Sequence, residues 1–475
     1  MRKEHDALGF LEVPDEVYYG IQTERNHIAF DISPLLLEDY PAFIEAGTKI
    51  KIACARTNLE IGALDKRRAE AIEQAAREIL EKKFSLDFPV NIYRGSGTPL
   101  NAGINEIVAH RANEILSGSK TEGGVHPSTH VNMAQSSNDV VPTAKKIVMW
   151  EQVTKILKSL NSLIQELERK GEEFSDVIKM GRTGIQDAVP ITLGQQLNAF
   201  AQGMKRSKQR LTQELHNCNH SCLGGTAVGT GMGCLPGFRA KVNKHLSDVL
   251  GRKIESYDDL VDGMMAIDDL IACHGIIVAL SAQVWKLARD LRLMSSGPES
   301  GLCEISFKTD KNCRTPLYPQ RYASNSLESV IAACNHVAAN NSGVLYGLKN
   351  GWLDLGACSS IPLRSIIDSS DQLVAAMDTL TKKVLPSIVP NKEFCKRMAE
   401  SSVSNSTMIS TIFGYEVGGK VAHLALEKNI SCQEAAKELN ILPEEIINEL
   451  FDVSNLTNPD NMERLFEKYK SYRKV

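Results

Sequence analysis

The segment VTKILKSLNSLIQELERKG, residues 153–171, is the part of the sequence that decides the fold. Its apolar residues recur every three or four positions, at Val153, Ile156, Leu157, Leu160, Leu163, Ile164 and Leu167. This spacing places them on one face of an α-helix, and Gly171 is a residue type at which helices commonly end. The segment is therefore predicted to be an amphipathic helix that packs in a bundle.

Three more segments have the pattern of long helices. They cover residues 193–220, 259–293 and 325–348. The second and third contain few charged residues through their middles, so we expect other helices to surround them. Only a large bundle, completed by other subunits, buries so much helix on all sides. We therefore predict a mainly α-helical subunit with a long central helical bundle.

The most apolar stretch, Ile271–Trp285, contains no Asp, Glu, Lys or Arg. It is shorter than the roughly 20 residues that a bilayer span needs, and it contains His274 and Ser281. We expect a buried core helix here rather than a membrane span.

The pattern of apolar runs and turn residues changes twice along the sequence, which suggests three domains. Residues 1–140 have short apolar runs and turn residues and are predicted to form a mixed, mostly helical domain. Residues 141–393 form the central bundle, and residues 394–475 a small helical domain. In the last part, Ser431 and Glu434 have capping-box spacing, and Pro443 precedes two acidic residues, so each site is predicted to begin a helix.

Composition narrows the range of partners. The chain of 475 residues has 54 Lys and Arg against 58 Asp and Glu, a net charge of −4. This balance gives no electrostatic reason to expect nucleic acid or an anionic membrane as a partner. A small polar substrate or another protein fits better.

The 11 cysteines are scattered, and no CxxC motif occurs. The first residues, MRKEHDALGFLEV, do not have the charged and then apolar pattern of a secretory leader. We expect reduced thiols and a cytoplasmic protein.

Three segments rich in Gly, Ser and Thr interrupt the helical patterns. They are GSGTP at 95–99, QSSND at 135–139 and KMGRT at 179–183. Small hydroxyl and amide side chains at helix starts can bind a carboxylate without a metal, because unsatisfied N–H groups point outward there. The alternative is that each segment is only a helix cap or a turn.

Longer stretches of the sequence are familiar. The N-terminal EHD at 4–6, EVP at 12–14 and YYGIQT at 18–23 resemble aspartate ammonia-lyases of the aspartase/fumarase superfamily, and fit that branch better than the fumarase branch. The resemblance continues, in order, through GSGTPLNAGINE, HVNMAQSSNDVVPTA, KMGRTGIQDAVPITLGQ, LGGTAVGTGMG and DLRLMSSGPESGLCEIS to the LTNP that ends at Pro459. It therefore covers essentially the whole chain.

The resemblance implies a three-domain helical subunit whose bundle joins three others in a tetramer, with each active site built from three subunits. It also implies reversible anti elimination of ammonia from L-aspartate, giving fumarate, without pyridoxal phosphate or zinc. In such a reaction a base removes a weakly acidic Cβ proton, and anion-binding donors stabilise the dianionic intermediate.

The resemblance also implies roles for particular residues. Thr98 in GSGT, Ser136, Ser137 and Asn138 in QSSND, and Thr183 in GRT match the positions that contact the substrate's carboxylates and amine.

The signature loop of the family, G-S-S-x-M-P-x-K-x-N, is altered in this chain. Its second Ser is the base, and its Lys and Asn bind carboxylate. Residues 313–323 here read CRTPLYPQRYA, with one residue inserted. If the insertion precedes the loop, Pro319 matches the motif Pro, Arg321 replaces the Lys, and Pro316 replaces the catalytic Ser. We favour this register because it keeps a proline and a cation.

If the insertion follows the loop, Thr315 occupies the position of the catalytic Ser. Gln320 and Tyr322 then replace the Lys and Asn. The candidate base, Thr315, comes from this second register. The candidate carboxylate ligand, Arg321, comes from the first, and its guanidinium can hold a carboxylate bidentately.

Further family positions differ near the expected site, including Gly184 after GRT and Glu299 after SSGP. Two main explanations compete. The chain is a lyase with a shifted substrate or base, or it is a catalytically impaired homologue that serves as a structural or regulatory subunit beside an intact paralogue. A fumarase-like C–O lyase is a further alternative. No sequence neighbour of Thr315 obviously lowers the pKa of its hydroxyl, which weighs against proton abstraction.

The alternation of His216, Cys218, His220 and Cys222 suggests zinc at first sight. On a helix the two pairs face different sides and cannot share one tetrahedral ion, so we predict no metal site. The family resemblance implies that no cofactor is needed either. His126 and His130 are expected to make loop hydrogen bonds rather than act as bases.

Overall fold

A computed structural model describes residues 1–472 except 85, 96, 267, 309–324, 350 and 357–360. The chain is mainly helical, as predicted, and the described strands form two-stranded sheets. It divides into two compact units. Unit 1 comprises Met1–Lys158, Gln209–Ser281 and His336–Leu373, and unit 2 comprises Ser159–Lys208, Ala282–Asn335 and Val374–Val475. The division into domains at 140 and 393 stays a prediction.

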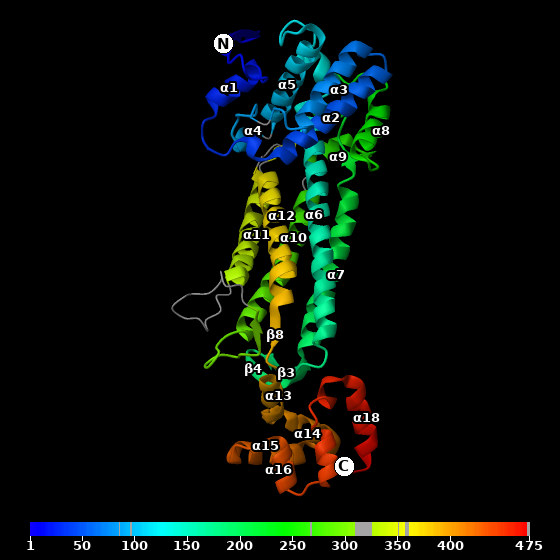
Figure 1. Ribbon diagram of the computed structural model, residues 1–475. Coiled ribbons are helices and arrows are strands. Elements are labelled where there is room, and N and C mark those ends of the chain that lie inside the picture. The colour runs from blue at the N-terminus through cyan, green and yellow to red at the C-terminus, as the bar shows by residue number, and fades with distance from the viewer. Residues whose placement is uncertain are drawn as a thin grey trace. The chain divides into compact units, whose positions relative to one another are not determined.

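Unit 1 begins with an antiparallel hairpin of β1 (Arg2–Asp6) and β2 (Gly9–Val13), followed by α1 (Ile21–Ala29). The central helix of this region, α2 (Pro41–Glu60), packs against α3 (Lys66–Leu80), α5 (Thr98–Ser117) and α8 (Phe238–Leu250), as Figure 1 shows. Their apolar faces make one core, in which Phe43, Ile50 and Ile104 are fully buried. Short elements complete the unit: η1 (Leu37–Asp39), α4 (Ile92–Gly95), η2 (Pro127–Val131), β5 (His220–Ser221), β6 (Glu255–Ser256) and α9 (Leu260–Met265).

The long helices are α6 (Ser137–Glu173), α7 (Leu193–Asn217), α10 (Asp268–Met294), α11 (Asn325–Lys349) and α12 (Ile361–Thr379). The stripe predicted for residues 153–167 lies in α6, where all of its members are buried except Leu157, which is partly buried. The helix predicted at 325–348 is confirmed, and the one at 193–220 ends early, at Asn217. The segment 259–293 is two helices, α9 and α10, rather than one.

The helix α6 does not stop at Gly171 but ends two residues later, at Glu173. A Cβ at Gly171 would lie 2.2 Å from Asn198 Oδ1 on α7, and a Cβ at Gly194 would lie 2.2 Å from the Gly171 carbonyl oxygen. Glycine at these positions therefore lets the end of α6 and the start of α7 approach each other.

The helix α10 contains the apolar stretch Ile271–Trp285. By length and composition alone α10 is able to cross a membrane, because an 18-residue window has a mean hydropathy of 1.6, and 44% of that window is buried. A core helix of a soluble protein passes the same test, so the finding carries little weight.

Unit 2 contains two antiparallel pairs, β3 (Ile178–Thr183) with β4 (Gln186–Thr192) and β7 (Ile305–Phe307) with β8 (Ile388–Pro390). Its C-terminal helices are α13 (Lys392–Ser401), α14 (Ser406–Phe413), α15 (Tyr415–Lys428), α16 (Cys432–Glu438), α17 (Glu444–Leu450) and α18 (Pro459–Tyr469). The short turns are η4 (Leu380–Val384), η5 (Leu385–Ser387), η6 (Val403–Asn405), η7 (Asn455–Thr457) and η8 (Lys470–Tyr472). The capping box predicted at Ser431 and Glu434 is confirmed, and Pro443 is the N-cap of α17.

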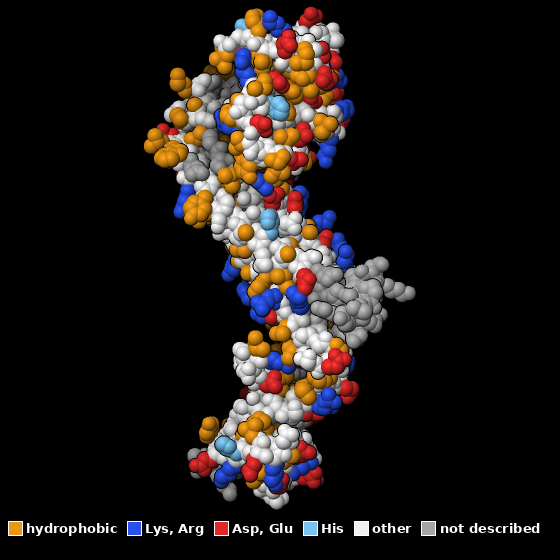
Figure 2. Space-filling model, turned by 90° about the vertical axis from the view of Figure 1, so that its left-hand side faces the viewer, with side chains coloured by type: hydrophobic (Ala, Val, Ile, Leu, Met, Phe, Trp, Pro, Cys, Tyr) orange, Lys and Arg blue, Asp and Glu red, His pale blue; other side chains and the backbone are white. Residues whose placement is uncertain are grey.

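Figure 2 shows Lys and Arg side chains interspersed with Asp and Glu side chains on the face that it displays. This mixture agrees with the small net charge of −4.

Candidate active site

Two long helices of unit 1 begin at predicted substrate-binding residues. Thr98 is the first residue of α5, and Ser137 is the first residue of α6. One turn into α5, the Asn101 amide donates to Ser137 Oγ over 3.0 Å and to Asn132 Oδ1 over 3.1 Å. Asn101 thereby ties the N-termini of the two helices together. Unsatisfied N–H groups at such termini favour a negatively charged ligand.

A buried carboxylate fixes the rest of the QSSND segment. Asp139 is fully buried; one of its oxygens accepts from Ser136 N over 2.9 Å, and the other accepts from Gly224 N and Thr226 N over 3.2 and 3.0 Å. Burial raises the pKa of Asp139 to about 7. The carboxylate therefore attaches the loop of the LGGTAVGTGMG motif to the start of α6.

Asn138 makes a second link to that loop, because its Nδ2 donates to the carbonyl of Ala227 over 2.9 Å. The backbone at Gly224 and Thr226 has φ values of +91° and +58°. The first suits glycine, and the second is uncommon for a residue with a side chain. Ser136, Ser137 and Asn138 all remain partly exposed, so they are accessible to a ligand.

The interior of this region contains a lysine that the sequence reasoning did not identify. Lys51, in the middle of α2, is fully buried, and its Nζ donates to Asn132 Oδ1 over 3.0 Å and to Gln135 Oε1 over 2.8 Å. Burial lowers the pKa of Lys51 to about 8. The sequence signal that could have revealed it is a lysine within the otherwise apolar run IKIACA.

Thr183 lies in unit 2, as the last residue of β3. The third Gly/Thr segment therefore begins no helix. It forms a hairpin whose two turn residues, Gly184 and Ile185, have φ values of +57° and +67°, as two-residue hairpin turns require. Thr183 is exposed, and the neighbouring Arg182 pairs with the buried Glu304 over 2.7 Å.

The candidate base Thr315 and the candidate carboxylate ligand Arg321 both lie outside the described residues. Their roles stay predictions, as does the choice between the two registers of the altered loop.

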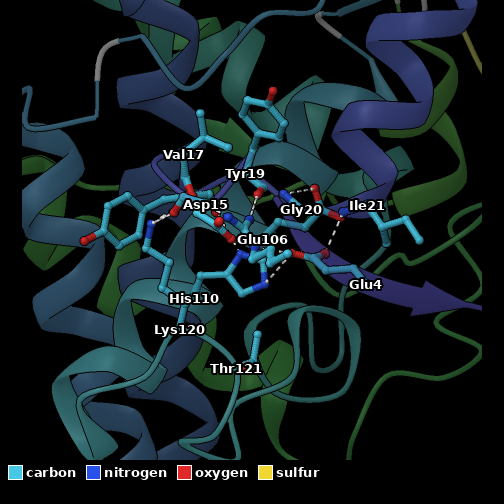
Figure 3. Close-up of polar contacts among 12 residues, drawn as sticks. Glu4, Asp15, Val17, Tyr19, Gly20, Ile21, Glu106, His110, Lys120 and Thr121 are labelled. Atoms are coloured by element: carbon cyan, nitrogen blue, oxygen red, sulfur yellow. Dashed lines mark hydrogen bonds and ion pairs between the residues drawn. The ribbon is translucent and has the colours of Figure 1, made fainter. Parts of the chain in front are cut away.

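The EHD and YYGIQT segments have a different role from the hydroxyl segments. Figure 3 shows the carboxylates of Glu4 and Glu106 directed at the first backbone amides of α1. Glu106 accepts from the N–H groups of Gly20, Gln22 and Thr23 over 2.7–3.1 Å, and Glu4 accepts from the N–H of Ile21 over 2.8 Å. This helix start is thus already occupied by the chain's own carboxylates. The start of α6 is capped more lightly, because Ser136 Oγ accepts from Asn138 N over 3.2 Å, and α5 has no side-chain cap.

The histidines expected to make loop hydrogen bonds do so. His126 Nδ1 accepts from Ser128 N and Thr129 N, and His130 Nδ1 accepts from His126 N over 2.8 Å. The premise that residues 216–222 form one helix is wrong, because α7 ends at Asn217 and His220 belongs to β5. Within the described ranges, no group of three or more His, Cys, Asp or Glu is arranged to hold a metal ion.

Comparisons with known proteins agree with this picture. A family model described as "Lyase" matches residues 9–313. The fumarate hydratase class II of Campylobacter jejuni is 34% identical over 462 residues, covering 96% of this chain and 99% of that one. The aspartate ammonia-lyase of Helicobacter pylori is 32% identical over 472 residues, covering 99% and 100% of the two chains.

Solved structures match over nearly the whole length. The fumarate lyase:delta crystallin of Brucella melitensis has a TM-score of 0.92 at 32% identity and covers 98% of this chain and 99% of that one. The recombinant class II fumarase of Schistosoma mansoni has a TM-score of 0.91 at 28% identity, with the same coverage. Fold, family model and relatives agree, and the chain belongs to the aspartase/fumarase superfamily of lyases.

Proposed function

We propose that the chain is a C–N lyase of the ammonia-lyase type. It would catalyse reversible anti elimination of ammonia from L-aspartate or a related amino acid, giving fumarate or an analogous unsaturated acid. The observation that carries the proposal is the meeting of the α5 and α6 N-termini. There Asn101 donates to Ser137 Oγ and to Asn132 Oδ1, and Asn132 Oδ1 also accepts from the buried ammonium group of Lys51. This arrangement is suited to a carboxylate.

The main requirement of this reaction is that the site stabilises a negatively charged intermediate. A base takes the Cβ proton, and the electron pair moves into the adjacent carboxyl group, which becomes a doubly charged intermediate. Collapse of that intermediate forms the C=C bond and expels ammonia. We propose that the hydroxyl groups of Thr98, Ser136 and Ser137, at the starts of α5 and α6, donate to the negative oxygens. Thr183 is proposed as a further contact, Arg321 as a carboxylate ligand and Thr315 as the base.

A fumarase-like C–O lyase is the second candidate, because the chain is also similar to the Campylobacter fumarate hydratase, at 34% identity. The same anion site would serve malate, and only the leaving group differs. The sequence observation in favour of the ammonia-lyase is the N-terminal EHD and EVP pattern.

A catalytically impaired structural or regulatory subunit is the third candidate, favoured by the altered loop at residues 313–323. We also propose a cytoplasmic tetramer, either homomeric or formed with an intact paralogue, whose active sites are each shared by three subunits. The limited burial of the apolar α10 within one chain supports association through the bundle.

Incubation of the purified chain with L-aspartate and, separately, with L-malate, while fumarate absorbance is followed, tests the three candidates. Fumarate from aspartate supports the ammonia-lyase, and fumarate from malate alone supports the C–O lyase. No turnover of either substrate, nor of a panel of aspartate-like amines, contradicts both. Co-purification of an intact paralogue from the native source would then identify the subunit role.

Matched serine variants connect the activity to the site. Ser137→Ala is expected to lower kcat/KM by about 10-fold to 100-fold, the effect of losing one hydrogen bond to a charged group. Ser117→Ala, at the exposed C-terminal end of α5, is expected to leave kcat/KM unchanged.

A further inference from the structure

A chain of hydrogen bonds runs from the interior of unit 1 to the start of α6. It begins at Lys51 Nζ, which donates to Asn132 Oδ1 over 3.0 Å. Asn132 Oδ1 also accepts from Asn101 Nδ2 over 3.1 Å, and Asn101 Nδ2 donates in turn to Ser137 Oγ over 3.0 Å. Four side chains from α2, the segment before α6, α5 and α6 thus make one continuous path.

The direction of each bond in this path follows from its first member. An ammonium group has donors and no acceptor, so Asn132 must turn its carbonyl oxygen toward Lys51. That oxygen in turn requires a donor from Asn101, which fixes the Asn101 amide with Nδ2 toward Asn132 and Ser137. The opposite orientation would bring two carbonyl oxygens together. Asn132 is held further because its own Nδ2 donates to the carbonyl of Gln135 over 3.2 Å.

The path ends at the Ser137 hydroxyl, and it determines which hydrogen-bonding role this hydroxyl has left. A serine hydroxyl has one hydrogen and two lone pairs. Ser137 Oγ uses a lone pair to accept from Asn101, and within the described part of the chain its hydrogen has no acceptor. Ser137 is partly exposed, so that hydrogen is available to an incoming anion.

We propose that Lys51 is a positioning residue for carboxylate binding: through Asn132 and Asn101 it holds the Ser137 hydroxyl in the orientation that donates to the substrate. This inference rests on the proposed function, because it assigns Lys51 to the same anion site. Lys51 does not touch the substrate.

The surroundings of Lys51 support a role beyond packing. Burying an ammonium costs several kilocalories per mole unless it is paired and hydrogen-bonded. Lys51 spends two of its donors on the neutral oxygens of Asn132 and Gln135. The charged or titratable groups that act on it are Asp139 of α6 and Cys54 on its own helix. A buried lysine whose direct partners are neutral amides orients those amides more than it stabilises the core.

A double-mutant cycle tests the inference in the full-length protein. The probe is succinate, a dicarboxylate that cannot undergo elimination, and its dissociation constant is measured by calorimetry. Lys51→Met keeps the apolar stem but removes the donors, and Ser137→Ala removes the hydroxyl. Each variant is expected to bind succinate about 10-fold more weakly. The double variant is expected to match Ser137→Ala within about twofold, since both changes act on the same bond.

Lys146→Met is the matched control, because Lys146 is another buried lysine of unit 1, which pairs with Asp269. It is expected to lower the thermal midpoint but to leave succinate affinity unchanged. If Lys51→Met does not fold, Asn132→Leu interrupts the same path, and the same cycle with Ser137→Ala applies. With any substrate that turns over, Lys51→Met is expected to raise KM about 10-fold, with kcat within about threefold.

Two results would overturn the role of Lys51 but leave the proposed function intact. One is wild-type affinity for succinate in Lys51→Met. The other is a double variant that binds succinate about 100-fold more weakly than wild type, because that is the product of two independent effects. A wild-type chain that binds neither succinate nor any aspartate-like substrate overturns the proposed function, and the role of Lys51 with it.

Discussion

Arg182 donates to the buried carboxylate of Glu304 over 2.7 Å. Lys179 lies 3.2 Å from the other oxygen of the same carboxylate. One acidic residue from the segment before β7 therefore holds both basic residues of the KMGRT strand. The pairing explains why these charges are present in β3 without invoking a ligand.

Replacing Glu304 by Gln is expected to lower the free energy of unfolding by about 3–5 kcal/mol. The buried Lys179 loses its paired carboxylate, and Arg182 keeps only its pair with the exposed Asp187. Lys392→Ala, which removes an exposed pair with Asp176 in the same unit, is expected to change it by less than about 0.5 kcal/mol. Urea unfolding of both variants measures the difference. Equal effects would mean that the Glu304 pairs are no more important than surface pairs.

The carboxylate of Glu106, which caps the start of α1, is also expected to stabilise the fold. Its buried carboxylate accepts three backbone N–H bonds and the Thr23 hydroxyl at the start of α1. In Glu106→Gln, one of the acceptor oxygens becomes an NH₂ group that faces donors. The free energy of unfolding is expected to fall by about 2–4 kcal/mol, with faster hydrogen exchange in α1. Glu70→Gln, at an exposed position on α3, is the control. Unchanged exchange in α1 would contradict the capping role.

The sequence predicted the helical class, the stripe of α6, the extent of α11 and the cap at Ser431, because these depend on local periodicity and capping chemistry. It failed where distant residues decide. Gly171 was expected to end a helix, but α6 continues because the glycine is needed for contact with α7. The break between α9 and α10 was also missed, because the apolar pattern over residues 259–293 contains no signal that ends a helix there.

The candidate site was predictable only as a set of segments. The hydroxyls of Thr98 and Ser137 were expected at helix starts, and they are there. Lys51 and Asp139 were missed because a buried charge gains its meaning from neighbours that are distant in the sequence, such as Gly224 and Thr226 around Asp139. The hairpin at Thr183 was missed because two turn residues with positive φ have no strong local signal when one of them is Ile185.

The buried carboxyl of Asp139 predicts a dependence of stability on pH. Its pKa in the folded chain is raised to about 7 from 3.8, so between about pH 4 and 7 the native state binds more protons than the unfolded state. The stability that this group contributes is complete below pH 4 and is lost as the pH rises through 7, by at most about 1.4 kcal/mol per pH unit.

Asp139→Asn removes this contribution, so the wild-type and variant free energies of unfolding are expected to differ by an amount that varies between pH 4 and 7. Urea titrations at several pH values within that window measure the slope. Parallel curves for the two proteins would show that Asp139 does not titrate there.

The cysteines are expected to resist thiol reagents in the folded protein. Seven of those described are buried and free: Cys54, Cys218, Cys222, Cys273, Cys334, Cys395 and Cys432. Burial raises the pKa of the Cys218 and Cys222 thiols to about 12, which leaves almost no thiolate at neutral pH. Brief alkylation followed by peptide mass spectrometry should leave these seven unmodified until denaturant is added. Labelling of Cys218 or Cys222 in native protein would show that this region opens readily.

The contact between the end of α6 and the start of α7 gives the sharpest test of packing, because backbone atoms make it. A Cβ at Gly194 would lie 2.2 Å from the Gly171 carbonyl oxygen and 2.9 Å from that of Phe174. Neither oxygen can turn away as a side chain can, so Gly194→Ala must separate the two helices, and a loss of about 2–4 kcal/mol is expected. Gly419→Ala in α15, where a Cβ meets nothing within 4 Å, should instead stabilise the chain by about 0.5–1 kcal/mol through helix propensity. Replacing glycine by alanine is therefore expected to shift the thermal midpoint down at position 194 and up at position 419. A midpoint in Gly194→Ala at or above that of wild type would mean that α6 and α7 do not meet in this way.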